Sequence, residues 1–148
     1  MKRTRATRAV ASTVRTLVLS QHDVVRRQLV AYLGRSPALA VSGEPFTPEV
    51  IIAARPDVLV LDLSQLGSAS LRAAIDAAQR VGAHLIALAS IREPADEQIV
   101  TSAGGLYRLK SAGADGLAEV VQQVADQARA PRGDEIHSAP PPVNRRAQ

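Results

Sequence analysis

The sequence predicts an α/β fold in which a five-stranded parallel sheet is doubly wound, with helices on both faces. Short apolar runs alternate with amphipathic segments five times along the 148 residues, as in parallel sheets joined by helical crossovers. The stretch 57–62 holds four consecutive apolar residues between two carboxylates, which is typical of a strand buried on both faces. Asp62 ends that strand, and the ligands of open α/β sheets bind at the carboxyl ends of the strands.

The expected elements follow one another in the order strand, then helix. The strands are expected at 15–20, 39–43, 57–62, 85–89 and 106–109. The helices are expected at 23–33, 48–54, 71–81, 96–103 and 114–128. The last helix has one apolar stripe, formed by Leu117, Val120, Val121 and Val124.

Turn residues mark the ends of the first two helices. His22 or Asp23 is expected to cap the first helix, and Gly34 to end it. Pro48 is expected to open the second helix, because proline is tolerated at a helix start but not inside. Pro56 disfavours helix in the residue before it and therefore separates this helix from the third strand.

Similar signals bound the next two helices. Ser70 is expected to cap the third helix, which ends at Gly82. The fourth helix is expected to end at Gly104 and Gly105, which are better explained as a helix stop than as a phosphate-binding loop.

The composition excludes several classes of protein. Aromatic residues make up 2% of the chain, so the core must be built from Ala, Val, Leu and Ile. The chain has no cysteine, which excludes disulfides and thiolate metal sites. No apolar run approaches the ~18 residues that a membrane span needs, so none is expected.

The net charge of +4 belongs to the ends of the chain. Residues 17–130 contain ten Lys/Arg and twelve Asp/Glu, a net charge of −2, whereas a nucleic-acid-binding body would carry a basic face. We expect one domain at 15–129, between a disordered basic arm at 1–14 and a disordered Pro-rich tail at 130–148. The arm is a solubilising tail, a weak contact with nucleic acid or an acidic membrane surface, or a transit peptide.

Four segments resemble the receiver domain of bacterial two-component response regulators, in particular the nitrate-regulator type. Arg55–Leu63 matches the phosphoacceptor strand almost residue for residue, and Val18–Arg26 resembles the first strand and the start of the first helix. Gly43-Glu44 resembles the end of the second strand, and Tyr107–Lys110 resembles the aromatic-x-x-Lys ending of the fifth. The resemblance covers residues 15–128 and implies a flavodoxin-like sheet.

The resemblance implies a role for several positions around the third strand. Asp62 corresponds to the phosphoacceptor, and Lys110 to the lysine that contacts the phosphoryl oxygens. Ala89 stands at the position of a switch Ser or Thr, which a one-residue shift would move to Ser90. Tyr107 is either a rotating switch aromatic or an ordinary edge residue.

The chain departs from this family where the family holds Mg²⁺. Ser20 and Gln21 stand at the positions of two carboxylates, which leaves Asp62 as the only acid there unless Asp23 reaches back. Each lost charge pair at a partly shielded site is worth ~4 kcal/mol. We therefore expect Mg²⁺ binding to be severely weakened, with Asp62 and Ser64 as the remaining candidate ligands, and we expect no other cofactor.

Two interpretations of Asp62 follow. It accepts a phosphoryl group from a histidine kinase, or it forms a lasting ion pair with Lys110 that closes the end of the sheet. We expect an atypical, stand-alone cytoplasmic receiver that is no enzyme beyond chemistry at Asp62. It would act through contacts with a histidine kinase or downstream effector, or by dimerising through residues 96–128, without a nucleic-acid-binding domain. A conventional phosphoacceptor and an unrelated α/β protein with another ligand are the alternatives.

Overall fold

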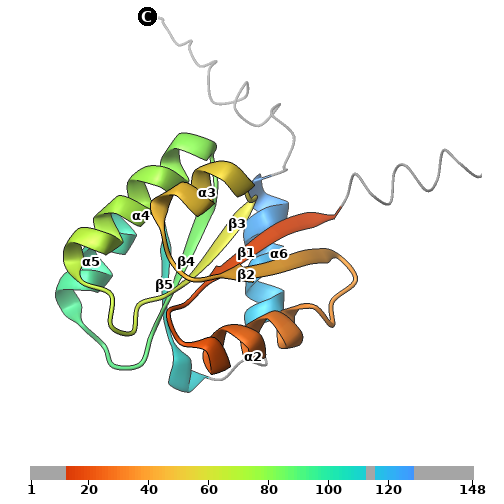
Figure 1. Cartoon of the computed structure of the whole chain (residues 1–148), viewed down its shortest axis with the longest axis horizontal. Coiled ribbons are helices and arrows are strands. Elements are labelled where there is room, and N and C mark those ends of the chain that lie inside the picture. The colour runs from red at the N-terminus through yellow and green to blue at the C-terminus, as the bar shows by residue number, and fades with distance from the viewer. Residues whose placement is uncertain (1–12, 113–115, 129–148) are drawn as a thin grey trace, which may run out of the picture.

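A central sheet of five parallel strands organises the computed structural model, which describes residues 13–112 and 116–128 (Figure 1). The spatial order of the strands is β2-β1-β3-β4-β5. The strands are β1 (Val14–Leu19), β2 (Leu39–Glu44), β3 (Val58–Asp62), β4 (His84–Ala89) and β5 (Leu106–Leu109). The helices are α2 (Asp23–Leu33), α3 (Pro48–Ala54), α4 (Ser68–Val81), α5 (Pro94–Ser102) and α6 (Leu117–Ala128), with a 3₁₀ turn η1 (Lys110–Ala112). The predicted doubly wound, flavodoxin-like fold is confirmed.

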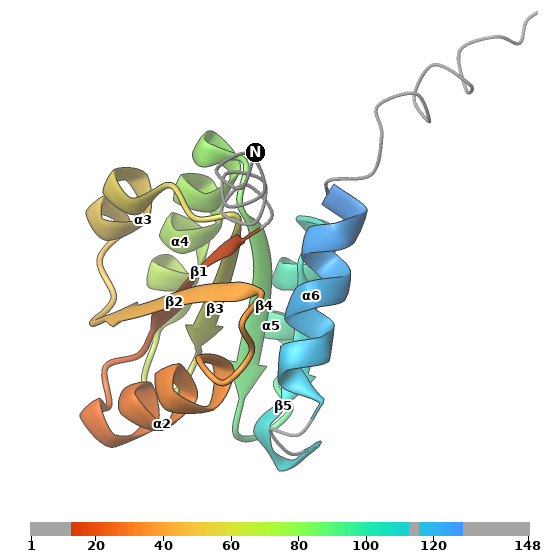
Figure 2. The same cartoon turned by 90° about the vertical axis from the view of Figure 1, so that its right-hand side faces the viewer.

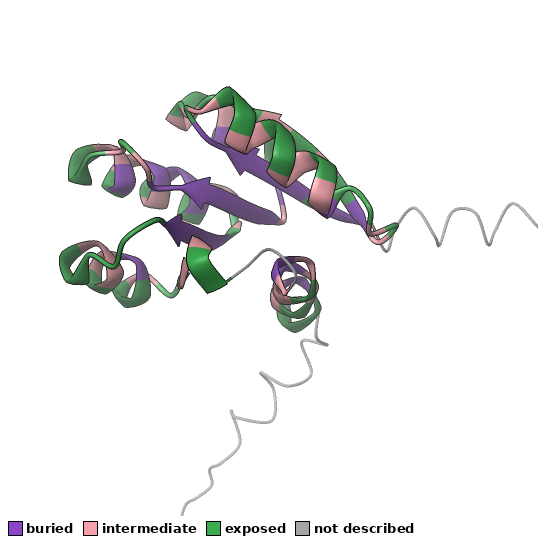
Figure 3. Cartoon of the chain, turned by 90° about the horizontal axis from the view of Figure 1, so that it is seen from below, coloured by how far each residue is buried: buried purple, intermediate pink, exposed green. Residues whose placement is uncertain are grey.

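The sheet separates two apolar layers. Helices α3, α4 and α5 pack on one face, and α2 and α6 pack on the other (Figure 2). Figure 3 shows the strands as a buried layer between helices whose outer sides are exposed. Strand β3 is buried along its whole length: Leu59 and Leu61 face the first layer, and Val58 and Val60 face the second. Each such side chain stabilises the fold by about 1.5–3 kcal/mol through burial alone.

The first half of the chain follows the predicted boundaries closely. Helix α3 has the predicted bounds, and Arg55 leaves the right-handed helical region (φ 47°, ψ 59°) just before Pro56. Its cap is Thr47, whose hydroxyl accepts a hydrogen bond from the N–H of Val50 at 3.2 Å. Strand β1 begins at Val14, one residue inside the expected arm. Three parts of the expected organisation lie outside the described residues: the arm up to residue 12, the last residue of the expected domain at 129, and the tail at 130–148.

Two predicted helix starts were wrong. Helix α4 begins at Ser68, because the carbonyl of Gly67 accepts the first helical hydrogen bond from Leu71 N–H at 2.9 Å. Ser70 therefore lies inside the first turn and is not the cap. Helix α5 begins at Pro94, two residues early, since proline is well suited to the first helical position. The described part of the last helix begins at Leu117, and its predicted first residues fall among 113–115, which are not described.

None of the helices that the structure describes has the length and apolarity needed to cross a lipid bilayer.

Candidate functional site

The carboxyl ends of β1, β3 and β4 bring one buried carboxylate to the edge of the sheet. Asp62 is the last residue of β3, and only 2% of its surface is exposed. Across the sheet Asp62 pairs with the apolar Leu88 of β4, which cannot satisfy a charge, and the pairing of β3 with β1 ends one residue earlier, at Leu61 and Leu19. A buried carboxylate must therefore find its partners in the loops beyond the strand ends.

Three donors occupy both oxygens of Asp62. Lys110 Nζ lies 2.6 Å from Oδ1, and the backbone N–H of Ser64 donates to the same oxygen at 3.1 Å. Ser20 Oγ donates to Oδ2 at 2.7 Å. The predicted Asp62–Lys110 pair is thus present, and Ser20 adds a neutral donor on the other side.

This environment fixes the charge of the carboxyl group. Burial alone would raise the pKa of Asp62. The hydrogen bonds from Lys110, Ser20 and the N–H of Ser64, with the nearby lysine charge, lower that pKa by more, so it lies below its usual range. Asp62 is therefore ionised at neutral pH and is neutralised by Lys110, whose side chain is 26% exposed.

Ser20 is held in place by its own turn. Its hydroxyl accepts a hydrogen bond from the N–H of His22 at 3.1 Å, which leaves the hydroxyl proton for Asp62. Its backbone carbonyl accepts a bond from Arg26 Nη1 at 2.8 Å. Ser20 is 1% exposed, so both orientation and burial make it a fixed donor rather than a solvated side chain.

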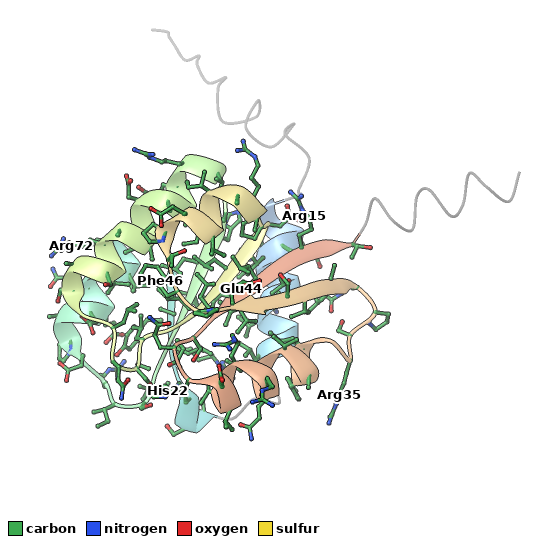
Figure 4. The ribbon with its side chains drawn as sticks, in the orientation of Figure 1. Arg15, His22, Arg35, Glu44, Phe46 and Arg72 are labelled. Atoms are coloured by element: carbon green, nitrogen blue, oxygen red, sulfur yellow. The ribbon has the colours of Figure 1, made fainter. Side chains whose placement is uncertain are left out.

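Gln21 and Asp23, which follow Ser20 in this turn, have side-chain partners other than Asp62. The side-chain carbonyl of Gln21 accepts a hydrogen bond from the backbone N–H of Phe46 at 3.0 Å, which ties the loop after β1 to the loop after β2. Asp23 forms an ion pair with Arg26 and is 66% exposed, so it does not reach back to Asp62. His22 lies at the start of α2, and Phe46 lies beyond the end of β2 (Figure 4).

A chain of hydroxyl groups continues from Lys110. Its Nζ also donates to Ser64 Oγ at 2.9 Å, and Ser64 Oγ lies 3.2 Å from Ser90 Oγ. Ala89 is buried in the layer of α3, α4 and α5 and brings no polar atom to the site. Of the two positions that the sequence left open, Ser90 is the one whose hydroxyl joins this network.

Tyr107 is linked to the loop that follows β4. Its hydroxyl accepts a hydrogen bond from Glu93 N–H at 3.0 Å and reaches the carbonyl of Ile91 at 3.5 Å. The ring is half-buried against the layer of α3, α4 and α5. Tyr107 therefore fastens β5 to the segment that begins with Ser90.

The donor set does not suit Mg²⁺. Within residues 13–112 and 116–128, no group of three or more His, Asp or Glu could hold a metal ion. Magnesium requires a near-octahedral set of oxygen ligands that includes carboxylates. Asp62 is the one buried carboxylate among the described residues, both of its oxygens accept hydrogen bonds, and a lysine already neutralises it. The hydroxyl of Ser64 already accepts a hydrogen bond from Lys110, and its N–H donates to Asp62.

Sequence reasoning missed three contacts of the site. It did not predict that Ser20 donates to Asp62, that Gln21 binds the loop after β2, or that Arg26 holds the turn after β1. Arg26 follows Asp23 by one helical turn, a spacing that signals their ion pair. The two contacts between distant segments have no such local signal.

No protein-family model matches the chain, and no curated protein does. Solved receiver domains match it in structure. The signal receiver domain of the putative response regulator NarL from Mycobacterium tuberculosis is 26% identical, with a TM-score of 0.60 over 81% of this chain and 99% of that one. A two-component response regulator of the LuxR family from Aurantimonas sp. SI85-9A1 is 21% identical, with a TM-score of 0.66 over 84% and 99%. The signal receiver domain of a putative Luxo repressor protein from Vibrio parahaemolyticus is 17% identical, with a TM-score of 0.68 over 84% and 97%.

Proposed function

We propose that this chain, which has the fold of response-regulator receiver domains, is an atypical receiver that signals without Mg²⁺-dependent phosphorylation of Asp62. The observation that carries the proposal is the hydrogen bond from Ser20 to Asp62, at 2.7 Å. It fills the oxygen of Asp62 that the lysine leaves open, at a position where the resemblance expects a metal-binding carboxylate.

The charges around the site support this proposal. Phosphoryl transfer to a carboxylate depends on positioning and on cations that neutralise the incoming oxygens. Here Lys110 is paired with Asp62 and Arg26 is paired with Asp23, so neither of these two carboxylates offers an uncompensated charge to a divalent cation. Oδ1 of Asp62 accepts two hydrogen bonds and Oδ2 accepts one, and each of these bonds makes its oxygen a weaker nucleophile toward phosphorus.

The same contacts support one stable conformation. Lys110 bridges Asp62 and Ser64, Ser64 meets Ser90, and Tyr107 fastens the loop after Ser90. This series of bonds joins the site to β5 without a phosphoryl group. We infer that the output is a protein–protein contact, with a downstream effector or a second copy, through the face at 96–128. The proposal includes a cytoplasmic location.

A conventional phosphoacceptor is the second candidate. It is favoured by the presence of Asp62, Lys110 and two hydroxyl groups, those of Ser64 and Ser90, around one point at the edge of the sheet. In this case Asp62 receives the phosphoryl group from a histidine kinase, and Lys110 moves to the phosphoryl oxygens.

The two candidates separate in a titration with Mg²⁺ and beryllofluoride, an analogue of the phosphoryl group, followed by amide NMR. We expect no saturable shift at Ser64, Leu88 or Lys110 at millimolar Mg²⁺. The double variant Ser20→Asp/Gln21→Asp, which supplies the two missing carboxylates, should gain a response.

Asp62→Asn in that double variant is the matched control and should abolish the gain. A saturable response of the native chain that Asp62→Asn removes would establish the conventional phosphoacceptor instead.

A further inference from the structure

The outer edge of β2 is an unpaired strand edge. This strand ends the sheet at the side away from β5, and no segment among the described residues pairs with its outer side (Figure 1). Natural proteins usually protect such edges with charges, proline or a bulge. The register of β2 with β1 is continuous, and from Leu39 to Gly43 the strand carries no charge and no proline. The edge is therefore open to another strand.

The hydrogen bonds at the two ends of β2 show which backbone groups face β1. Val14 N–H donates to the carbonyl of Ala38 at 2.8 Å, and Ser20 N–H donates to that of Glu44 at 3.3 Å. Backbone groups alternate in direction along a strand. The even-numbered residues of β2 therefore bond to β1, and the odd-numbered residues direct their N–H and C=O groups outward.

Three residues of β2 direct their backbone outward, and two of them have both groups free. The N–H of Leu39 already donates to the carbonyl of Ser36 at 3.1 Å. Beyond the strand, Pro45 has no N–H to donate. Val41 and Gly43 are thus the two positions that offer a donor and an acceptor together.

The face of β2 on the side of α3 is also uncovered. Ser42 pairs with Leu17, whose side chain packs in the layer of α3, α4 and α5. Ala40 and Glu44 share the face of Ser42, and all three are exposed. Helix α3 has only seven residues and leaves a hollow of about 370 Å³ between itself and the first two strands. Arg15 and Ala40 both line this hollow.

One cation and one anion on this face lack partners. Arg15 lies at the start of β1, beside Ala40, and Glu44 lies at the end of β2 (Figure 4). Within the described part of the chain, neither side chain forms an ion pair. Four residues separate Ala40 from Glu44 along the strand, about 13 Å, so the two charges do not meet within one copy.

We propose that β2 pairs in antiparallel fashion with β2 of a second copy of this chain, across a two-fold axis at Ser42. In this register Val41 lies opposite Gly43 of the second copy, and the two residues exchange both backbone hydrogen bonds. The symmetry makes this exchange occur twice. The same register sets Ala40 opposite Glu44 of the second copy.

The charges match this register. Glu44 of the second copy and Arg15 stand on either side of Ala40, on the same face. Two strand spacings of about 4.8 Å separate their backbones, so the two long side chains meet over the small Ala40. The hollow beside α3 gives this ion pair room, and it forms twice across the axis.

The inference goes beyond the proposed function and does not depend on how Asp62 is used. The edge at β5 lies at the other end of the sheet, so the second copy leaves the face of α5, β5 and α6 free. A dimer built in this way carries one output face on each copy.

The test combines sedimentation equilibrium of the full chain over a range of concentrations with amide hydrogen exchange. We expect a reversible approach to twice the chain mass of 15.6 kDa, with the amides of Val41 and Gly43 protected only where the dimer forms. Glu44→Arg sets like charges together and should weaken the dimer by about tenfold or more, as should Arg15→Glu. The double variant Arg15→Glu/Glu44→Arg should restore the dimer.

Glu119→Arg is the matched control, because it makes the same change of charge at an exposed position of α6 and should leave the dimer unchanged. A chain that stays monomeric would refute the proposal, as would a dimer that the charge exchange does not restore. A dimer weakened by Glu119→Arg and not by Glu44→Arg would place the contact at 96–128 instead. Protection of Val41 and Gly43 in a monomer would show that another segment of the chain covers this edge, and would overturn the proposal equally.

Discussion

The ion pair between Lys110 and Asp62 gives a quantitative test of the site. We consider Lys110→Met, which keeps an unbranched apolar stem and removes the charge. Removing one partner of a fully buried pair costs about 3–5 kcal/mol. We expect about 2 kcal/mol here, because Ser20 and the Ser64 N–H remain as donors and the lysine side chain is 26% exposed.

The loss should depend on pH with a defined sign. The pKa of Asp62 is lower in the folded chain than in the unfolded one, so its stabilising contribution is complete above the unfolded pKa. That contribution disappears as the pH falls through the folded pKa. In Lys110→Met the lysine no longer counteracts the desolvation of the Asp62 carboxylate, so the pKa of Asp62 rises. The loss of unfolding free energy relative to the native chain should therefore shrink as the pH falls toward about 4.

Urea unfolding of both proteins at neutral pH and at stepwise lower pH measures this deficit. Arg80→Met is the control, since it removes an exposed i,i+4 pair with Asp76 and should change stability by less than about 0.5 kcal/mol. Lys110→Met/Asp62→Asn should be more stable than Lys110→Met alone, because no buried charge remains unpaired. A deficit no larger than that of the control, or one that is independent of pH, would refute the reasoning.

Three further substitutions test other contacts. Ser20→Ala removes a neutral hydrogen-bond donor from Asp62 and should lower the free energy of unfolding by about 1–2 kcal/mol in urea unfolding. It should also raise the pKa of the Asp62 carboxyl in an NMR titration, and an unchanged pKa would contradict the 2.7 Å bond. Thr47→Ala should cost about 1 kcal/mol in urea unfolding through the lost cap of α3, and the Thr47→Ser control should lose little. Gly43→Ala should cost about 1–3 kcal/mol in the same assay, because its Cβ would lie 2.7 Å from a methyl group of α2. Gly67→Ala, with open space around the new methyl group, is its control, and equal losses would disprove the steric argument.

Much of the fold could be predicted because it depends on local patterns. Apolar runs and turn residues place each strand, and parallel strand ends must meet at one edge, so the proximity of Asp62 and Lys110 follows from strand order. The predicted start of α4 was wrong because Ser70 was preferred as the cap over Gly67, and the predicted start of α5 was wrong because the helix was expected to begin at Asp96. The structure shows Gly67 and Glu93 at the cap positions without a side-chain cap hydrogen bond, and Pro94 in the first turn of α5.

The fine structure of the site could not be predicted for a different reason. The donation from Ser20 to Asp62 joins residues 42 positions apart, and the contact between Gln21 and Phe46 joins residues 25 positions apart. Such contacts depend on rotamers that only the packed molecule selects. The resemblance to receiver domains implies carboxylates at the positions of Ser20 and Gln21, and the structure shows the contacts that these two residues make instead.

The serine against Asp62 also determines what kind of signal a receiver of the proposed type carries. In a phosphorylated receiver the active state depends on a covalent bond, and it ends when that bond is hydrolysed. A receiver whose conformation is held by Ser20 and Lys110 has no such bond, so hydrolysis does not limit the lifetime of its active state. The size of the response then follows the number of molecules in the cell, and control passes to synthesis, to degradation and to whatever competes for the output face.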